Sequence, residues 1–299
     1  MNIYWHTSLA FTSGLAEFFQ ALSKYEFLQN AVWAGLLVSV AGGVVGTYVV
    51  VRRIIFMAGS IAHCVLGGIG AALYLRRAHG WEWLDPIYGA VAVALLAAVI
   101  IGWVSMKAKQ REDTVIGAMW AIGMAAGILF ISQTPGYAED LISYLFGSIL
   151  MVTKADLWII AVLDAVVVLL GLLFYKQFLA VCFDEEFART RGIRVEFYYM
   201  LLLILTALTV VLLVRVVGVI LVIALLTLPV AVAGQFARRL WQMMILAALL
   251  TVLFTSSGLA LSYGPGLRAG PTIIMLSGAV YLLVIIASSL RRRFSKIKP

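Results

Sequence analysis

The feature that most constrains this chain is a series of apolar runs, each about twenty residues long, that recur along its whole length. An α-helix of that length spans the hydrocarbon core of a bilayer, where every backbone group must pair internally because water is absent. Segments of about ten residues with alternating polarity, typical of a membrane β-barrel, do not occur in the sequence. Because 64% of the residues are hydrophobic and 12% are charged, we predict an all-α, polytopic membrane helix bundle surrounded by lipid.

The apolar runs predict one membrane domain, residues 27–290, between two short terminal segments. We place nine spans, at residues 28–51, 54–75, 86–106, 114–133, 156–175, 197–214, 216–236, 241–262 and 270–289. The sixth and seventh spans are short and nearly continuous, so an eight-span bundle stays open. Residues 1–26 predict an interfacial segment, and residues 291–299 a basic cytoplasmic tail. Residues 140–151 predict a half-helix that is too short to span.

The positive charge predicts membrane topology and argues against nucleic acid as a partner. The net charge is +8, and most of the 22 Lys and Arg residues fall in alternate loops and in the C-terminal tail. The positive-inside rule makes that face cytoplasmic, with the N-terminus outside and the C-terminus inside. Arg76 and Arg77 fall on the opposite face and are an exception. Cys64, in a predicted span, and Cys182, in a predicted cytoplasmic loop, should lie too far apart for a disulfide.

One side chain that can bind metal lies near the centre of the second apolar run. His63 is roughly 14 Å from the cytoplasmic end of that helix, close to mid-bilayer. Gly59 and Gly67 share its helix face, and such small residues let a neighbouring backbone or a passing solute come close. Neutral imidazole binds Zn²⁺, Mn²⁺ and Fe²⁺ well, so we predict a metal route. A structural histidine bonded to a neighbouring helix is the alternative.

Asp164 is the only acidic residue well inside an apolar run, and a carboxylate there needs a cation or a proton. Arg215 is the expected partner, because both residues should lie in the outer half of the bilayer. A structural ion pair and a transient metal ligand are the two interpretations. Pro229 interrupts the seventh span and predicts a kink, which transporters use but passive bundles also contain.

The segment Asp184–Gly192 predicts a short cytoplasmic helix with acids at its start, arginines at its end and Gly192 as a C-terminal cap. Such an element suits the docking of a soluble partner, although a solvated connector would look the same. The sequence has no GxxxxGK[ST] phosphate loop and no HExxH or GxSxG motif. We therefore predict a transport subunit that is not itself an enzyme.

From about residue 30 to 285 the chain resembles the permease subunits of ABC importers for zinc, manganese and related divalent metals. The matching stretches are RRIIFMAGSIAHCVLGGIG, EDTVIGAMWAIGMAAGILFIS, DLISYLFGSILMVTKADLW, FDEEFARTRGI, VVGVILVIALLTLPVAVA and GLALSYGPGLRAGPTII. The resemblance implies a prokaryotic cell-membrane protein that pairs with a second copy of itself, with cytoplasmic ATPase subunits and with an extracytoplasmic metal-binding lipoprotein. It implies no permanently bound cofactor, and a transported divalent metal.

The resemblance also implies that residues 183–193 form the coupling helix that docks on the ATPase. The contacts are expected from Asp184, Glu185, Ala188, Arg189 and Gly192. The family places the histidine that matches His63 beside its metal route, which Gly59, Gly67 and Pro229 would line or gate.

One departure from the family bears on the ion. Many members carry an acidic residue four positions before the histidine, where this chain has Gly59, and a serine directly before it, where this chain has Ala62. A lone imidazole binds weakly and favours zinc over the harder Mn²⁺, unless Asp164 supplies the missing charge. Two other functions stay open: import of metal chelates or cobalamin-like cofactors, and a secondary carrier or channel that needs no ATPase.

Overall fold

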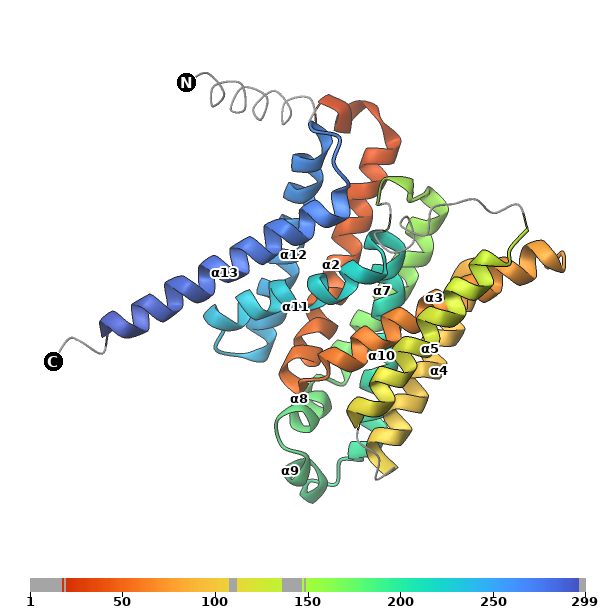
Figure 1. The fold of residues 1–299 in the computed structure, drawn as a ribbon. Helices are drawn as coiled ribbons and strands as arrows, with labels where there is room; N and C mark the ends of the chain where they lie inside the picture. The colour runs from red at the N-terminus through yellow and green to blue at the C-terminus, as the bar shows by residue number, and fades with distance from the viewer. Residues whose placement is uncertain (1–17, 19, 108–111, 136–146, 148, 296–299) are drawn as a thin grey trace.

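The computed structural model describes residues 18, 20–107, 112–135, 147 and 149–295, and within them it contains helices and no strands (Figure 1). The elements are α2 (Glu26–Arg52), α3 (Ile55–Ala78), α4 (Pro86–Lys107), α5 (Glu112–Ser132), the 3₁₀ turn η1 (Ile149–Met151), α7 (Lys154–Leu173), α8 (Tyr175–Phe183), α9 (Glu185–Thr190), α10 (Val195–Val217), α11 (Val219–Phe236), α12 (Leu240–Tyr263) and α13 (Ala269–Ser295). The predicted all-α class is confirmed.

Nine of the helices in the described ranges are long and apolar enough to cross a membrane: α2, α3, α4, α5, α7, α10, α11, α12 and α13. The nine predicted spans are therefore present as nine separate candidate membrane helices in the described part of the chain. The sixth and seventh spans separate at Gly218, whose φ of 85° and ψ of 165° end α10 and begin α11. L-residues rarely adopt that conformation, so glycine makes this tight break possible.

The helices form an inner group and an outer group. Most of α2, α3 and α10 is buried within the protomer, whereas α5, α7 and α13 leave most of their apolar surface exposed. In a bilayer such surface meets lipid or another protein. The short helices α8 and α9 extend from the end of the bundle at which α2 finishes (Figure 1).

Glycines let α3 approach two neighbours at backbone distance. A Cβ added at Gly68 would lie 2.2 Å from the carbonyl oxygen of Gly89 in α4, and one added at Gly70 would lie 2.7 Å from that of Gly127 in α5. A Cβ at Gly123 would lie 2.6 Å from Cα of Cys64. Such contacts are how membrane helices gain dispersion energy without a hydrophobic driving force between them.

On α2 one of two expected close contacts falls one position away, at Gly43 instead of Gly42. The spacing of Gly42 and Gly46 predicts that both pack closely. A Cβ at Gly46 would indeed lie 2.7 Å from the carbonyl oxygen of Leu226, but one at Gly42 would meet nothing within 4 Å. Gly43 is instead the residue that lies against α12, because a Cβ added there would lie 2.7 Å from the Cβ of Ala248.

The terminal predictions fall largely outside the described residues. Of the predicted interfacial segment, residues 1–17 and 19 lie outside them, and residues 20–24 are helical. Of the predicted half-helix at 140–151, the structure describes residue 147 and the η1 turn. Helix α13 continues to Ser295, so the basic tail begins inside a helix.

We predict that Gly68→Ala separates α3 from α4, because its methyl group would overlap the Gly89 carbonyl. Overpacking of this kind costs about 1–3 kcal/mol of folding free energy. Gly42→Ala is the matched control, since it adds the same methyl group to a helix interior where there is room and gains about 1 kcal/mol of helix propensity. Thermal unfolding of the two purified variants in detergent measures the difference. Equal Tm values would contradict the proposed close approach.

Candidate functional site

His63 lies on the buried side of α3 and stacks on an aromatic ring of α5. Only 6% of its surface is exposed. The imidazole and the Trp120 ring are 4.1 Å apart between centroids and inclined by 18°. Among the described residues, Nδ1 of His63 is one of two buried side-chain nitrogen or oxygen atoms without a hydrogen-bond partner. The ring is thus held by stacking and not by a hydrogen bond at Nδ1, which leaves that nitrogen's lone pair or proton unsatisfied.

Two hydrogen bonds tie α3 to α5 on either side of the imidazole. Ser60 Oγ donates to the carbonyl oxygen of Ile116 at 2.9 Å, and Cys64 Sγ donates to that of Met119 at 3.1 Å. Both acceptors lie one turn or less from Trp120. These two hydrogen bonds therefore fix α3 and α5 in the register that stacks His63 on Trp120.

The small residues that share the face of His63 also meet neighbouring helices. A Cβ at Gly59 would lie 2.9 Å from Cδ1 of Ile223 in α11, and one at Gly67 would lie 3.0 Å from the carbonyl oxygen of Gly123 in α5. Of the two possibilities raised by the sequence, a close backbone is present at Gly67, and a neighbouring side chain fills the space at Gly59. In this conformation the Gly59–His63–Gly67 stripe is covered by α5 and α11.

The expected ion pair between Asp164 and Arg215 is wrong. Arg215 donates instead to Asp156 Oδ1 at 2.6 Å, and Asp156 also completes a capping box with Thr153 at the start of α7. Asp164 accepts a hydrogen bond from the backbone N–H of Ala41 in α2 at 3.0 Å. The reason is depth: Asp156 lies at the end of α7 that faces Arg215, and Asp164 lies two turns, about 12 Å, further along the helix.

The structure does not bring Asp164 to His63. Asp164 is 7% exposed and lies against α2, whereas His63 lies against α5. Within the described ranges no three His, Cys, Asp or Glu side chains gather closely enough to hold a metal ion. The described part of a single protomer therefore offers no group of three such side chains around the imidazole.

The short helix predicted at Asp184–Gly192 is present as α9, with caps at both ends. Asp184 is the N-cap, and its Oδ1 accepts from the backbone N–H of Phe187 at 2.9 Å. At the other end the N–H of Ile193 donates to the carbonyl of Ala188 and that of Gly192 to the carbonyl of Arg189, each at 3.0 Å. These two bonds, with φ of +75° at Gly192, make a Schellman motif. Six residues thus form a defined helix.

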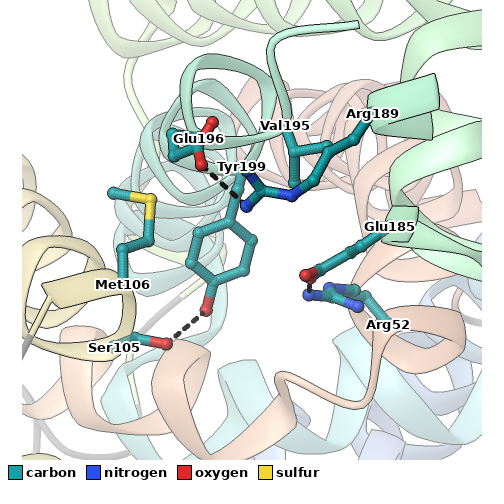
Figure 2. A pocket seen from close by; sticks show the side chains of 8 residues that line it. All are labelled: Arg52, Ser105, Met106, Glu185, Arg189, Val195, Glu196 and Tyr199. Atoms are coloured by element: carbon teal, nitrogen blue, oxygen red, sulfur yellow. Dashed lines mark hydrogen bonds and ion pairs between the residues drawn. The ribbon is translucent and has the colours of Figure 1, made fainter. Parts of the chain in front are cut away.

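Three of the expected docking residues face the chain's own bundle. Ala188 is fully buried. Glu185 pairs with Arg52 at the end of α2, and Arg189 pairs with Glu196 of α10 at 2.7 Å. Figure 2 shows both pairs around a polar pocket of about 240 Å³ between α2, α4, α9 and α10. These side chains seat α9 on the membrane domain.

The outward side of α9 presents aromatic and charged groups. Phe187 is 51% exposed and Phe183, just before the helix, is 68% exposed. Glu186 and Thr190 are exposed beside them, and the guanidinium of Arg191 lies 5.2 Å from the centroid of the Phe187 ring. Exposed aromatic side chains with an arginine are typical of a protein-binding surface.

Pro229 lies inside α11, which continues to Phe236 without a break. It is buried, and Thr227 Oγ1 nearby donates to the carbonyl oxygen of Ile223 at 2.6 Å. A proline there leaves one carbonyl of the preceding turn without its helical partner. The residue therefore weakens the hydrogen bonding of α11 beside Leu226 and Val230, which lie against Gly46 of α2.

Sequence reasoning missed Trp120, Asp156 and Arg52. Trp120 is one of many aromatic residues in apolar runs, and nothing in the sequence marks it as the partner of His63. Asp156 could have been found from the Thr-x-x-Asp pattern that begins α7. Arg52 was counted only toward topology, because its pairing with Glu185 joins residues 133 positions apart.

Comparisons with known proteins agree over most of the chain. Residues 24–288 match the family model described as "ABC 3 transport family". The chain is 42% identical over 248 residues to a protein of Chlamydia pneumoniae named as a probable metal transport system membrane protein, covering 83% of this chain and 84% of the relative. It is 33% identical over 269 residues to the manganese import system permease protein ScaB of Streptococcus gordonii, covering 90% and 94%.

A solved structure has the same fold. PsaBC from Streptococcus pneumoniae in complex with Fab matches with a TM-score of 0.80 and 34% sequence identity. The match covers 90% of this chain and 94% of that chain. The agreement therefore extends from the sequence to the arrangement of the helices.

We predict that Cys182 of α8 does not react with maleimides in the folded protein at pH 8. It is buried and free, as is Cys64, in agreement with the expected absence of a disulfide. Burial raises the pKa of Cys182 to about 12, so about one thiol in ten thousand is ionised at pH 8, and the thiolate is the reactive form. At pH 8, labelling of Cys182 should appear only on unfolding.

Thr190→Cys, at the exposed end of α9, is the positive control. Mass spectrometry of the labelled protein separates the two sites. Complete modification of Cys182 at pH 8 without unfolding would show that α8 does not pack as described.

Proposed function

The chain belongs to the ABC 3 transport family, and on that premise we propose that it is the permease subunit of an ATP-driven importer of divalent metal ions. The observation that carries the proposal is the family match over residues 24–288, nearly the whole chain. The names of the Chlamydia pneumoniae and Streptococcus gordonii relatives support metal as the cargo. The fold shared with PsaBC and the nine candidate membrane spans in the described part of this chain support the permease role.

The proposal assigns ATP hydrolysis to separate subunits. This chain has no phosphate-binding loop of the GxxxxGK[ST] type. It would pair with a second copy of itself in the cell membrane and bind two cytoplasmic ATPase subunits. A metal-binding lipoprotein would deliver the ion at the outer face, with the N-terminus outside and the C-terminus in the cytoplasm, as the positive-inside rule predicts.

In this proposal α9 is the element that docks on the ATPase. Its caps make it a rigid unit, and its outward side presents Phe183 and Phe187. Glu185 and Ala188 support the same role from the other side, because they fix α9 to the membrane domain. Substitutions at those two positions would therefore disturb both the packing of α9 on the membrane domain and its contact with the ATPase. Substitutions of the exposed aromatic residues test the ATPase contact alone.

The metal route is proposed to run past His63. A single imidazole holds an ion weakly, which suits transport because a tightly held ion would not leave. The stacked Trp120 ring covers His63 in this conformation, so opening the route requires α5 and α3 to shift relative to each other. ATP-driven closure of the motor would bias that two-state element through α9. Asp164 bonds α2 instead and is left outside the route.

Which divalent ion is transported depends on the ligands beside His63. The absence of a carboxylate beside His63 on α3 favours Zn²⁺, because harder Mn²⁺ prefers carboxylate oxygen. The name of the Streptococcus gordonii relative favours manganese. Metal-stimulated ATP hydrolysis by the reconstituted complex, measured with Zn²⁺, Mn²⁺ and Fe²⁺ in turn, ranks the ions directly.

We predict that His63→Ala lowers uptake of the preferred ion at least about tenfold. Removing a residue that only hydrogen-bonds a metal ligand lowers metal affinity or activity about 10–100-fold, and removing the ligand itself should cost no less. The complex should still assemble, since alanine fits where a buried imidazole stood. Uptake of radioactive metal into proteoliposomes that contain the whole complex measures the effect. His79→Ala, at the exposed end of the same helix, is the matched control and should behave like the wild type.

Two outcomes would count against this reading. Unchanged uptake by His63→Ala would leave the histidine structural. Uptake by the purified chain alone, driven by an ion gradient without ATPase subunits, would point to a secondary carrier instead.

We predict that Phe187→Asp weakens binding of the ATPase subunit about tenfold or more, because exposed aromatic anchors dominate protein interfaces. Helix α9 should remain folded, since Phe187 contributes only its backbone to the N-cap bond. Co-purification on a tag attached to the permease measures the loss. Trp83→Asp, an exposed aromatic residue in the loop between α3 and α4, is the control, and equal recovery of the ATPase with both variants would refute the docking role.

A further inference from the structure

Arg52 lies at a corner where three parts of the chain meet. It is the last residue of α2, and only Arg53 and Ile54 separate it from the start of α3. Its guanidinium pairs with Glu185 in the first turn of α9. The same guanidinium lies 5.4 Å from the centroid of the Tyr199 ring in α10. One side chain thus contacts α9 and α10 while its backbone ends α2.

Tyr199 carries the contact on to two further helices. Its hydroxyl donates to Sδ of Met57 in α3 at 3.3 Å and is hydrogen-bonded to Ser105 Oγ of α4 at 3.2 Å. Met57 lies six residues before His63 on the same helix, roughly 9 Å along its axis. Figure 2 shows the guanidinium and the tyrosine ring on opposite sides of the polar pocket, with Glu185 above the guanidinium.

The second ion pair of α9 is placed differently. Arg189 and Glu196 are both more than half exposed, whereas the side chains of Arg52 and Glu185 are 25% and 38% exposed. Solvent screens the Arg189–Glu196 pair more strongly. The Arg52–Glu185 pair is therefore the stronger of the two ion pairs. Arg189 also joins α9 only to α10, which begins a few residues later in the chain.

The Arg52 contact is also incompletely satisfied. Its Nε is the second buried side-chain atom without a hydrogen-bond partner in the described part of the chain. A buried donor left unpaired is costly. The N–H at Nε is therefore free to donate to a new acceptor, as expected of a group that changes partners between two arrangements of α9.

We propose that Arg52 is the positioning residue that transmits movement of α9 to the transmembrane helices, through Glu185 on one side and through Tyr199 to α3 and α4 on the other. The inference rests on the proposed function, because it takes α9 as the element that the ATPase moves. A planar guanidinium suits the role, since it binds a carboxylate and stacks on an aromatic ring at once, which a lysine ammonium does less well.

The test uses the complete complex in proteoliposomes, with ATP hydrolysis and uptake of Zn²⁺ or Mn²⁺, whichever the wild type carries, measured in the same sample. The ratio of metal transported to ATP hydrolysed reports transmission. A purely structural role would lower the amount of complex and its Tm but leave this ratio unchanged. Arg52→Gln should lower the ratio about tenfold, within the usual range of coupling between sites, with the ATPase still bound.

Arg53→Gln is the matched control, because it removes the same charge one residue away at an exposed side chain. Its ratio should stay within about twofold of the wild type, as for most surface substitutions. Arg52→Lys should give a value between those of Arg52→Gln and the wild type. Arg52→Glu combined with Glu185→Arg restores the ion pair and should recover part of the ratio that each single change loses.

Equal ratios for Arg52→Gln and Arg53→Gln would overturn the inference. If Arg52→Gln does not assemble, Tyr199→Phe decides, because it keeps the ring near the Arg52 guanidinium and removes only the hydroxyl that reaches α3 and α4. A severalfold lower ratio in that variant supports transmission, and an unchanged ratio overturns it. Failure of the wild-type complex to carry any of the ions would defeat the proposed function itself, and with it this inference.

Discussion

The fold depends on the backbone-to-backbone approach of α3 to its two neighbours. Gly68 lets the α4 backbone come within the distance that a single methyl group would occupy, and Gly70 and Gly123 do the same for α5. In lipid no hydrophobic effect draws helices together, so dispersion at short range has to hold them. These contacts bury the middle of α3 and bring His63 onto the ring of Trp120.

In the described part of the chain, the charged side chains that form ion pairs lie near helix ends. Asp156 is satisfied by a cap and by Arg215 at one end of the bundle, and Arg52 meets Glu185 at the other. Between them, His63 and Asp164 are buried with few partners. Burial of such groups is costly, so their presence marks places where structure or transport requires them. The ends of the bundle carry the fixed charges, and the centre carries the groups that an ion or a proton could satisfy.

The sequence predicted well wherever the cause was local. Hydropathy located nine spans to within a few residues, because membrane thickness alone sets their length. The acids at the start of α9 and Gly192 at its end predicted its caps, since both act within one turn. Prediction failed where a partner lay far along the chain. Arg215 was assigned to Asp164, and Gly42 was expected at a contact that Gly43 makes. In both cases the residue type was predicted correctly. The error lay in the position along the helix for the partner of Arg215, and in the direction around the helix axis for the glycine.

The sequence by itself therefore determined that the described part of this chain holds nine helices long and apolar enough to cross a membrane, a short capped helix after α8, and a histidine near the middle of the second of the nine helices. Each of these follows from composition and spacing within a single element. Only the tertiary structure decided that Trp120 covers the histidine, that α9 is seated by Arg52, and that Asp164 faces α2. A helix can turn about its axis, and slide along it, without changing its own hydrogen bonds, so these pairings are set by how neighbouring helices pack and not by any local pattern.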